Sequence, residues 1–426
     1  MKILIVGSGG REHALGYKIA QSPLVDKIYF APGNGGTYEY GENVDISATD
    51  LEGLAAFAKK EAIDLTVVGM DDPLVAGIVD VFEREGLRIF GPNKDAAIIE
   101  GSKAFSKDLM KKYKIPTAEY EVFEEDKKAL EYLKTCKYPV VLKADGLALG
   151  KGVLICNEFN EAKEGLRSIM IEKEFGSAGD KLVVEEFMEG REVSVLLFCD
   201  GTNVLPMTSA QDHKRAYDGD MGPNTGGMGT FSPSPFYTEG IHAYCMEHIY
   251  IPTMKAMKAE GRDFKGILFV GLMLTAEGPK VLEYNARFGD PETQVVLPRM
   301  KEDIVPIFLA CIDGTLDKMT LRFEDNAAVC VVLASKGYPL SYEKGYEITG
   351  LSDFDNKEYF MFHAGTKKEE NKILTSGGRV IGVTATGNSL VEAREKAYRK
   401  AEEVQFSNKY MRTDIGKAIT DAASSK

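Results

Sequence analysis

Paired cysteines and clustered histidines are missing from this sequence. Its six cysteines are scattered, no two of them form a Cys-x-x-Cys pair, and none has a histidine at the spacing of a zinc site. The five histidines are also dispersed, and only His213 falls in a polar motif. We therefore expect structural thiols that pack as small hydrophobic groups, and no zinc centre.

The sequence also lacks an excess of positive charge and a long apolar run. Its formal net charge of -13 argues against a surface built for nucleic acid or anionic lipid, although local lysines and arginines can still hold anionic substrates. No apolar run is long enough to span a membrane, and the stretch from Met1 to Gly7 is too short and wrongly flanked for a signal peptide. We expect a soluble, cytoplasmic protein with no nucleic-acid or membrane partner.

Regular hydrophobic patterns are present, and they divide the chain. Its 426 residues are enough for roughly two to four domains. Residues 1 to about 92 alternate between strand and helix patterns, which predicts an open parallel sheet in a Rossmann-like N-terminal domain of residues 1–102. The expected strands are 2–6, 27–30, 65–68 and 87–90, and the expected helices are 12–21, 51–61 and 74–85.

Two glycine-rich loops follow the first two predicted strands. The stretch from Gly7 to Glu12 opens a helix, so its backbone amides can receive an anion. The stretch from Pro32 to Thr37 is a second loop of the same kind. The first loop lacks the dinucleotide fingerprint because Glu12 stands where that motif has glycine, which argues against a dehydrogenase.

A new domain begins with the helix expected from Gly101 to Lys114. A short apolar strand then ends in Lys143 and leads into a glycine-flanked hairpin that can close over phosphates. The hairpin is not a Walker A loop, because only three residues separate Gly146 from Gly150 and because Gly152 takes the place of its Ser or Thr. A surface hairpin without a ligand is the alternative interpretation.

The next polar features are a hinge and a long loop. The strand from Leu182 to Phe187 leaves one small domain, and free backbone groups beside Met188 can receive a purine edge, although plain core packing is the commoner explanation of such residues. The segment from Gln211 to Gly229 is polar and rich in glycine, so it can bury almost nothing and its order must come from a ligand or from neighbouring strands.

Charged residues at the start of this segment suit a small charged substrate. Asp212 can hold an ammonium group, and Lys214 and Arg215 can meet phosphate or carboxylate. His213 can act as a general base, but a structural histidine is at least as common.

Hard oxygen ligands are concentrated between Val281 and Gln294. Alternation predicts a strand on which Val281, Glu283 and Asn285 share one face, with Leu282 and Tyr284 on the other.

Arg287, Asp290 and Glu292 follow this strand. An acid and an amide side by side, with a guanidinium next to them, suit a divalent cation that bridges phosphate groups. A solvated edge strand that runs into a polar turn is the alternative.

The chain changes character near Arg322, where we expect a separate α+β domain of residues 322–426. Its expected strands are 327–334, 345–348, 359–364, 373–374 and 379–386, followed by an amphipathic helix at 390–404. Gly365 to Lys367 and Ser376 to Arg379 are candidates for an anion contact across a cleft, or else ordinary hairpin turns. The tail after Ile415 is expected to be frayed.

These motifs make essentially the whole chain resemble one family, phosphoribosylamine–glycine ligase, also called glycinamide ribonucleotide synthetase, of the ATP-grasp superfamily. The last three of the matching stretches look specific to this family. The stretches are Gly7 to Ala14, Lys143 to Leu147, Gly150 to Val153, Gln211 to Arg215, Gly222 to Gly229 and Arg287 to Gln294. The resemblance implies an ATP-grasp domain at residues 103–321, with a mobile lid at about 126–187.

The resemblance also implies a reaction in purine biosynthesis. Glycine and 5-phosphoribosylamine would be joined through an amide, by way of glycyl phosphate, while ATP becomes ADP and phosphate. ATP and Mg²⁺ or Mn²⁺ would be the cofactors, and the enzyme would be a monomer. Another ATP-grasp carboxylate-amine ligase should lack Gly222 to Gly229 as written, and a non-catalytic nucleotide-binding protein should have lost Glu283, Asn285 or Arg287.

Residue by residue, the resemblance assigns roles to positions of this sequence. Glu283 and Asn285 would bind the metal, and Arg287 and Asp212 would be catalytic. The nucleotide would contact Lys103, Lys143, Gly150, Lys151, Gly152, Glu185, Glu186, Met188 and Glu192. The substrates would contact Gly9, Gly10, Asp212, Lys214, Asn224, Thr225, Arg287, Asp290 and Arg379. Many ATP-grasp enzymes carry a further metal-binding glutamate on the preceding strand, and the corresponding position in this sequence falls near Gly271.

Overall fold

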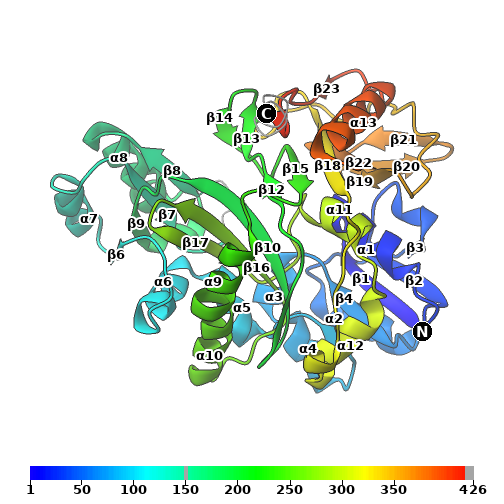
Figure 1. The fold of residues 1–426 in the computed structure, drawn as a ribbon, viewed down its shortest axis with the longest axis horizontal. Coiled ribbons are helices and arrows are strands. Elements are labelled where there is room, and N and C mark those ends of the chain that lie inside the picture. Colours follow the sequence, from blue (N-terminus) through cyan, green and yellow to red (C-terminus); the bar gives the residue numbers. More distant parts are fainter. Residues whose placement is uncertain (148–151, 418–426) are drawn as a thin grey trace.

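The computed structural model describes residues 1–147 and 152–417 (Figure 1). The N-terminal part is a parallel sheet in the order β3-β2-β1-β4-β5, which confirms the Rossmann-like prediction. The strands are β1 (Lys2–Gly7), β2 (Lys27–Pro32), β3 (Glu42–Asn43), β4 (Leu65–Val68) and β5 (Ile89–Phe90). The helices are α1 (Gly10–Ile19), η1 (Thr37–Glu39), α2 (Leu51–Lys60), α3 (Asp71–Ala76), α4 (Ile78–Arg84) and α5 (Lys94–Gly101).

One helix predicted in this part is divided in two. Gly77 separates α3 from α4 and has a φ of +99°, a left-handed conformation that glycine adopts without the steric cost of a Cβ. The prediction of a single helix at 74–85 is therefore wrong, because an interruption by one glycine leaves the hydrophobic pattern of a helix almost unchanged.

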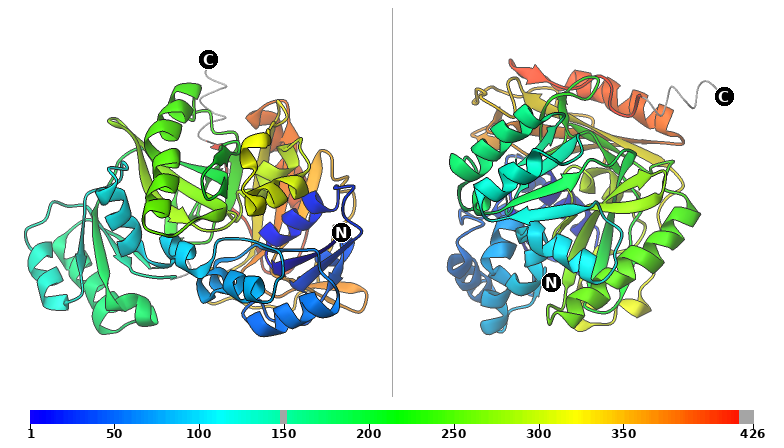
Figure 2. Two further views of the ribbon diagram at one scale, coloured as in Figure 1. Left: turned by 90° about the horizontal axis from the view of Figure 1, so that it is seen from below. Right: turned by 90° about the vertical axis from the view of Figure 1, so that its left-hand side faces the viewer.

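Four antiparallel strands in the order β6-β9-β7-β8 form a small sheet, which is accompanied by the helices α7 and α8 and by two short helical turns. Its elements are β6 (Tyr120–Phe123), α7 (Asp126–Leu133), β7 (Val140–Ala144), β8 (Val153–Cys156), α8 (Phe159–Leu166), η2 (Arg167–Ile171), η3 (Gly176–Asp180) and β9 (Leu182–Glu186). This sheet has its own apolar core, which includes Leu142, Leu166 and Leu182. It projects to one side of the molecule (Figure 2).

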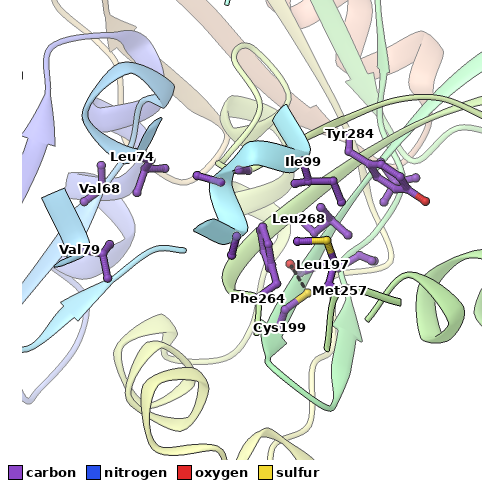
Figure 3. Packing of buried hydrophobic residues seen from close by; sticks show 14 of the residues in the cluster. Val68, Leu74, Val79, Ile99, Leu197, Cys199, Met257, Phe264, Leu268 and Tyr284 are labelled. Carbon is purple, nitrogen blue, oxygen red and sulfur yellow. Dashed lines mark hydrogen bonds between the residues drawn. The ribbon is translucent and has the colours of Figure 1, made fainter. Parts of the chain in front are cut away.

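The central sheet has the order β11-β10-β16-β17. Its strands are β10 (Arg191–Asp200), β11 (Val204–Pro206), β16 (Lys265–Thr275) and β17 (Gly278–Asn285). The accompanying helices are α6 (Lys103–Lys112), α9 (Glu239–Cys245), η4 (Met246–Tyr250), α10 (Ile251–Ala259), α11 (Thr293–Val296), η5 (Leu297–Arg299), α12 (Ile304–Asp313) and η6 (Leu316–Lys318). One buried cluster runs from Val68 and Leu74 to Leu268 and Tyr284 (Figure 3), so the N-terminal sheet and the central sheet share a core.

The C-terminal sheet has six strands: it contains β12-β15-β18-β22-β19, and β23 also pairs with β18. Its elements, with two separate hairpins and a covering helix, are β12 (Gln211–Asp212), β13 (Arg215–Tyr217), β14 (Met221–Asn224), β15 (Gly229–Ser232), β18 (Ala327–Ser335), β19 (Tyr359–His363), β20 (Thr366–Glu369), β21 (Lys372–Thr375), β22 (Arg379–Gly387), α13 (Leu390–Glu403) and β23 (Lys409–Tyr410). The polar segment at 211–229 is thus ordered by neighbouring strands. The predicted strand at 345–348 is wrong, because these residues form only one isolated bridge, Glu347 to Leu374.

A β-bulge changes the predicted face of β17. Glu283 pairs with Gly271 and Val281 pairs with Leu272, so Leu282 is an extra residue in the strand. Val281 consequently packs in the same core as Tyr284, while Leu282 packs in a separate cluster beside Met188. The prediction that Val281 shares a face with Glu283 is therefore wrong.

Across residues 1–147 and 152–417, every helix is too short or too polar to cross a lipid bilayer.

Candidate functional site

Glu283 lies at the centre of a group of positive charges. Its Oε1 atom is 3.4 Å from Lys214 Nζ. Lys214 most strongly, and then Lys143, Lys103 and Arg287, lower the pKa of Glu283 to about 2, against the opposing effect of burial. The carboxylate is thus ionised at neutral pH, and the same ion pairing raises the pKa of Lys214.

Asn285, two residues further along β17, is held by the buried Glu100 of α5. Asn285 Nδ2 donates to Glu100 Oε1 over 2.9 Å, which leaves Asn285 Oδ1 as an acceptor. Glu100 Oε2 accepts a hydrogen bond from Ala286 N at 2.7 Å, and Arg287 Nη2 lies 3.3 Å from Glu100 Oε1. Burial raises the pKa of Glu100 while Arg287 lowers it.

Sequence reasoning missed Glu100. It lies four residues after the buried Ala96 and next to the buried Ile99. An acid on the buried face of a short helix is a signal that could have identified it.

The donor atoms of Glu283 and Asn285 fit a divalent cation. An ionised carboxylate and an amide oxygen are both hard ligands, and Mg²⁺ commonly takes its other ligands from water and phosphate. Within the described ranges, no group of three or more His, Cys, Asp or Glu residues is placed to hold a metal by itself. Gly271 faces Glu283 across the strand pair, so the position expected for a further ligand has no side chain.

Each of three lysines in the region of the nucleotide candidates is held by a nearby oxygen atom. Both carboxylate oxygens of Glu185 are paired, Oε1 with Lys143 Nζ at 2.9 Å and Oε2 with Lys107 Nζ at 3.0 Å. Lys143 Nζ also donates to Leu282 O at 3.3 Å, and Lys103 Nζ donates to Gly146 O at 2.8 Å. Glu185 therefore holds Lys143 in place.

Lys107 is a buried partner that the sequence did not indicate. Burial lowers its pKa to about 8 despite the opposing effect of Glu185. It lies one helical turn after Lys103 in α6, on the same side of the helix, which is the only sequence signal for it.

One of the remaining nucleotide candidates, Met188, belongs to a small apolar cluster. Met188 packs with Ala118, Met273 and Leu282, apart from the larger cores, and offers a surface that an aromatic ring can cover. Glu186 is exposed at the end of β9, and Glu192 Oε2 lies 3.5 Å from Lys214 Nζ. Gly152 is buried and its carbonyl accepts a hydrogen bond from Ala144 N, whereas Gly150 and Lys151 lie outside the described residues.

The half-buried Asp212 and the buried Glu292 form an acidic pair, because the charge of Glu292 acts on Asp212. Burial first, and then the charge of Glu292, raise the pKa of Asp212 well above its usual value, and Lys214 lowers it in part. Burial also raises the pKa of Glu292, whose Oε1 accepts a hydrogen bond from Ser194 Oγ at 3.2 Å. Two carboxylates that share this environment attract a cation or a proton.

The loop beside this pair is closed by its own hydrogen bonds. Thr225 Oγ1 donates to Lys214 O at 2.8 Å and accepts from Gly227 N at 3.0 Å, so its hydroxyl is used inside the loop. Asn224 is half-buried and pairs with Arg215 in the β13–β14 hairpin. A Cβ at Gly227 would lie 2.7 Å from Asp212 Oδ1, so only glycine fits this close to the acid.

His213 has a structural position. Its Nδ1 lies 3.1 Å from Gly229 O, and its Nε2 accepts a hydrogen bond from Gly416 N at 3.1 Å. Since the backbone uses both ring nitrogens, neither is free to take a proton from a substrate. Burial, and then Arg412, lower the pKa of His213 below its usual value.

A cavity of about 360 Å³ lies between the loops of the N-terminal sheet and those of the C-terminal sheet, at the lower end of the range of small-molecule sites. It brings together the substrate candidates Gly9, Asp290 and Arg379. Its lining residues are Ser8, Gly9, Pro32, Gly33, Asn34, Asp290, Ala364, Gly365, Thr366, Ser376 and Arg379. Both N-terminal loops and both C-terminal turns noted in the sequence contribute to it.

Arg379 is fixed at the edge of this cavity. Its Nη1 donates to Gly226 O and to Asp290 O, each at 2.8 Å, and its Nη2 lies 3.3 Å from Asp290 Oδ2. Burial raises the pKa of Asp290, but Arg379 and Arg11 outweigh it, so the net shift is downward. Gly10 is not in the lining, because it packs against Gln294.

Three family models match consecutive parts of the chain. They are the phosphoribosylglycinamide synthetase N domain at residues 1–100, the ATP-grasp (A) domain of the same synthetase at residues 101–293, and its C domain at residues 328–418. Together they cover most of the sequence.

Similar proteins agree with these matches. A phosphoribosylamine–glycine ligase of Caldanaerobacter subterraneus is 53% identical over 97% of this chain and 99% of its own length. One of Haemophilus influenzae is 50% identical over 98% of each chain. The crystal structure of phosphoribosylamine–glycine ligase from Thermotoga maritima superposes with a TM-score of 0.86 at 37% identity, over 97% of this chain and 100% of that one. The chain therefore belongs to the phosphoribosylglycinamide synthetase family.

Proposed function

We infer that this chain is an ATP-dependent ligase that joins glycine to 5-phosphoribosylamine, giving glycinamide ribonucleotide, ADP and phosphate in purine biosynthesis. The observation that carries this assignment is the position of Glu283. It lies 3.4 Å from Lys214 Nζ, among lysines that can meet phosphates. Lys214 also interacts with Asp212 and Glu292, the acidic pair that can hold an ammonium group. The family relationship names the same substrates.

The first step would be transfer of the γ-phosphoryl group of ATP to glycine. A carboxylate oxygen of glycine attacks the γ-phosphorus, the bond to the ADP oxygen breaks, and glycyl phosphate forms. Lys103, Lys143 and Arg287 would hold and neutralise the phosphate oxygens, because such a transfer needs mainly alignment and charge stabilisation. Asp212 and Glu292 would keep the glycine amino group as an ammonium ion, so that it cannot act as a competing nucleophile.

The second step would form the amide. The amine of 5-phosphoribosylamine attacks the glycyl carbonyl carbon, the carbon–oxygen bond to phosphate breaks, and the amine loses a proton as phosphate leaves. The sugar phosphate would occupy the 360 Å³ cavity, with Arg379 and the loop at Gly9 towards its phosphate and Asp290 towards its hydroxyl groups. An amine nucleophile needs no dedicated base, so His213 has no part in this scheme.

Glu283 and Asn285 Oδ1 would hold a divalent cation, which we propose is Mg²⁺ or Mn²⁺. When bound, such a cation neutralises phosphate charge and acts as a Lewis acid. All of the residues assigned here come from one chain, so the proposal needs no second copy of the protein and is consistent with a monomer.

The test is phosphate release from ATP and Mg²⁺ with freshly generated phosphoribosylamine. Turnover should require both glycine and the amine, should fail with alanine in place of glycine, and should fall by about 100-fold or more in Glu283→Ala. Glu277→Ala, which changes an exposed acid in the β16–β17 turn, is the matched control and should keep full activity. Turnover that is indifferent to either substrate would contradict the assignment and would favour another ATP-grasp ligase.

A further inference from the structure

Arg412 is the largest of the fully buried side chains, although it lies outside the candidate site. Its Nη1 donates to Arg215 O at 3.0 Å and lies 2.9 Å from Asp220 Oδ1. Its Nε and Nη2 donate to the two carboxylate oxygens of Asp414 at 2.7 and 2.8 Å. A buried guanidinium with this many partners fixes the relative position of the backbones that it joins.

Arg215 and Asp220 belong to the β13–β14 hairpin, and neighbours of Arg412 also bind this hairpin. Thr413 N and Oγ1 donate to the carboxylate of Asp218 at 2.8 and 2.6 Å. Gly219 N donates to Asp414 Oδ2 at 2.8 Å, and Tyr410 Oη donates to Ala216 O at 3.0 Å. Residues 410–416, which we name the C-terminal segment, therefore bind residues 215–220 through both backbone and side chains.

The C-terminal segment also reaches the residue between Asp212 and Lys214. Gly416 N donates to His213 Nε2, so Nε2 carries no proton and Nδ1–H donates to Gly229 O. His213 N in turn donates to Asp212 Oδ1 at 2.7 Å. The contact thus runs from the C-terminal segment to the acidic pair in two steps.

The other side of the C-terminal segment is anchored to α13. Arg394 Nε donates to Ile415 O at 2.8 Å and its Nη2 donates to Thr413 O at 2.7 Å. Tyr398 Oη donates to Arg412 O at 2.8 Å and accepts from Ile415 N at 3.0 Å. Since α13 packs on β18 and β22, the segment connects a rigid layer to the hairpin.

The tip of this hairpin is exposed. Tyr217 and Met221 are 45% and 65% exposed, so burial of apolar side chains contributes little at its tip. Lys214 and Asn224 lie at its two ends, and a displacement of about 1 Å in a positioned group can reduce turnover by about 100-fold.

We propose that the C-terminal segment, with Arg412 as its central positioning residue, holds the loop of Asp212, Lys214 and Asn224 in the geometry that glycine requires. This inference rests on the proposed function, because it takes these residues to be the glycine site. The C-terminal domain would then serve both substrates: glycine through this segment, and the sugar phosphate through Arg379.

The experiment compares kinetic constants for the two substrates in the full chain. Thr413→Val and Asp220→Asn change exposed partners and Arg412→Ala removes the buried one. Each should raise the KM for glycine, by about 10-fold to 100-fold in Arg412→Ala, with the KM for phosphoribosylamine changed less than about twofold. Arg399→Ala, an exposed arginine of α13 that contacts Tyr359, is the matched control and should change neither.

Two further measurements keep the inference testable if Arg412→Ala folds poorly. In the double variant Asp218→Asn with Thr413→Val, the KM for glycine should rise no further than in either single variant, since the two residues act through one contact. The second measurement is the tautomer of His213 in ¹⁵N spectra, with its signals assigned by comparison with His213→Gln. The parent protein should show a protonated Nδ1 and an unprotonated Nε2, and Thr413→Val should show a mixture of the two tautomers.

Equal changes in the KM values for the two substrates, or unchanged KM values in variants that fold, would overturn the inference. The proposed function would still stand if the parent protein turned over with glycine and the amine. If the parent protein showed no such turnover, the proposed function itself would fail.

Discussion

Glu100 holds three groups of the candidate site at once, and its removal should show this. Glu100→Ala takes the acceptor from Asn285 Nδ2, Ala286 N and Arg287. Since partners of this kind orient the ligands that they touch, we expect turnover or Mg²⁺ affinity to fall by about 10-fold to 100-fold. Titration of activity with Mg²⁺ measures the effect.

The control at this position is Glu100→Gln, which keeps the shape and one acceptor oxygen and should lose less. An unchanged Mg²⁺ dependence in Glu100→Ala would show that Asn285 does not need this partner.

The ionised carboxylate of Asp212 should lower the stability of the folded protein when no substrate is bound. Burial and Glu292 raise its folded-state pKa above the unfolded value of 3.8. Its contribution to stability is therefore fully present below pH 3.8 and is lost as pH rises through the folded-state pKa. Asp212→Asn removes this loss, so we expect its Tm to exceed that of the parent by about 1–4 °C at pH 8, with the difference shrinking at lower pH.

The same variant should lose about 30-fold or more in kcat/KM for glycine, because the ammonium group loses a charged partner. Thermal melts between pH 5 and 8 test the stability effect, with the exposed Asp317→Asn as control. A Tm difference that does not vary with pH would contradict the account of Asp212.

At the scale of elements, the part of the small sheet from α7 to β9 should behave as a lid. We propose that the segment at about 126–187 closes over the nucleotide, with domain limits of 1–102, 103–321 and 322–426. Its separate core and its projecting position support this (Figure 2). It is tied to α6 by Lys103 Nζ, which donates to Gly146 O, and by Ser102 Oγ, which donates to Asp145 Oδ1 at 3.0 Å.

Limited trypsin digestion measures this closure. ATP with Mg²⁺ should slow cleavage within 126–187 severalfold, because closure buries the segment against the nucleotide. Glu283→Ala should lose most of this protection if the cation links nucleotide and lid. Equal cleavage with and without ATP and Mg²⁺ would argue against a lid.

Elements with regular apolar patterns could be predicted from the sequence, and features that depend on pairing could not. Alternation predicts β17, but the bulge at Leu282 exists only in its register against Gly271 and Leu272. Lys107 and Glu185 are ordinary charged residues until the fold places them 3.0 Å apart. The residue pattern and the resemblance both predicted Glu283 and Asn285 as metal ligands. Neither indicated Glu100, whose contact with Asn285 spans 185 residues of sequence.

For the whole molecule, the cavity between the first and last sheets makes a separate prediction. Arg379→Ala removes hydrogen bonds to Gly226 O and Asp290 O and a cation from the cavity edge. We expect the KM for phosphoribosylamine to rise by about 10-fold or more, with a smaller change in the KM for ATP. Ribose 5-phosphate should raise the Tm of the parent and have little effect on this variant.

Lys372→Ala, which changes an exposed cation of β21 outside the cavity lining, is the control. An equal rise in the KM for ATP and for the amine would show a general loss of structure instead of a sugar-phosphate contact.

The same cavity has a consequence for the protein during its own synthesis. Translation proceeds from the N-terminus, so the nucleotide-side residues up to Arg287 leave the ribosome well before Gly365, Ser376 and Arg379, which complete the cavity. A nascent chain, or one cut short by a premature stop codon, would then carry lysines for ATP without a complete compartment for the sugar. Such a chain lacks Gly365, Ser376 and Arg379, so we expect it to bind no sugar phosphate, and formation of the amide has to wait until the C-terminal domain has been made.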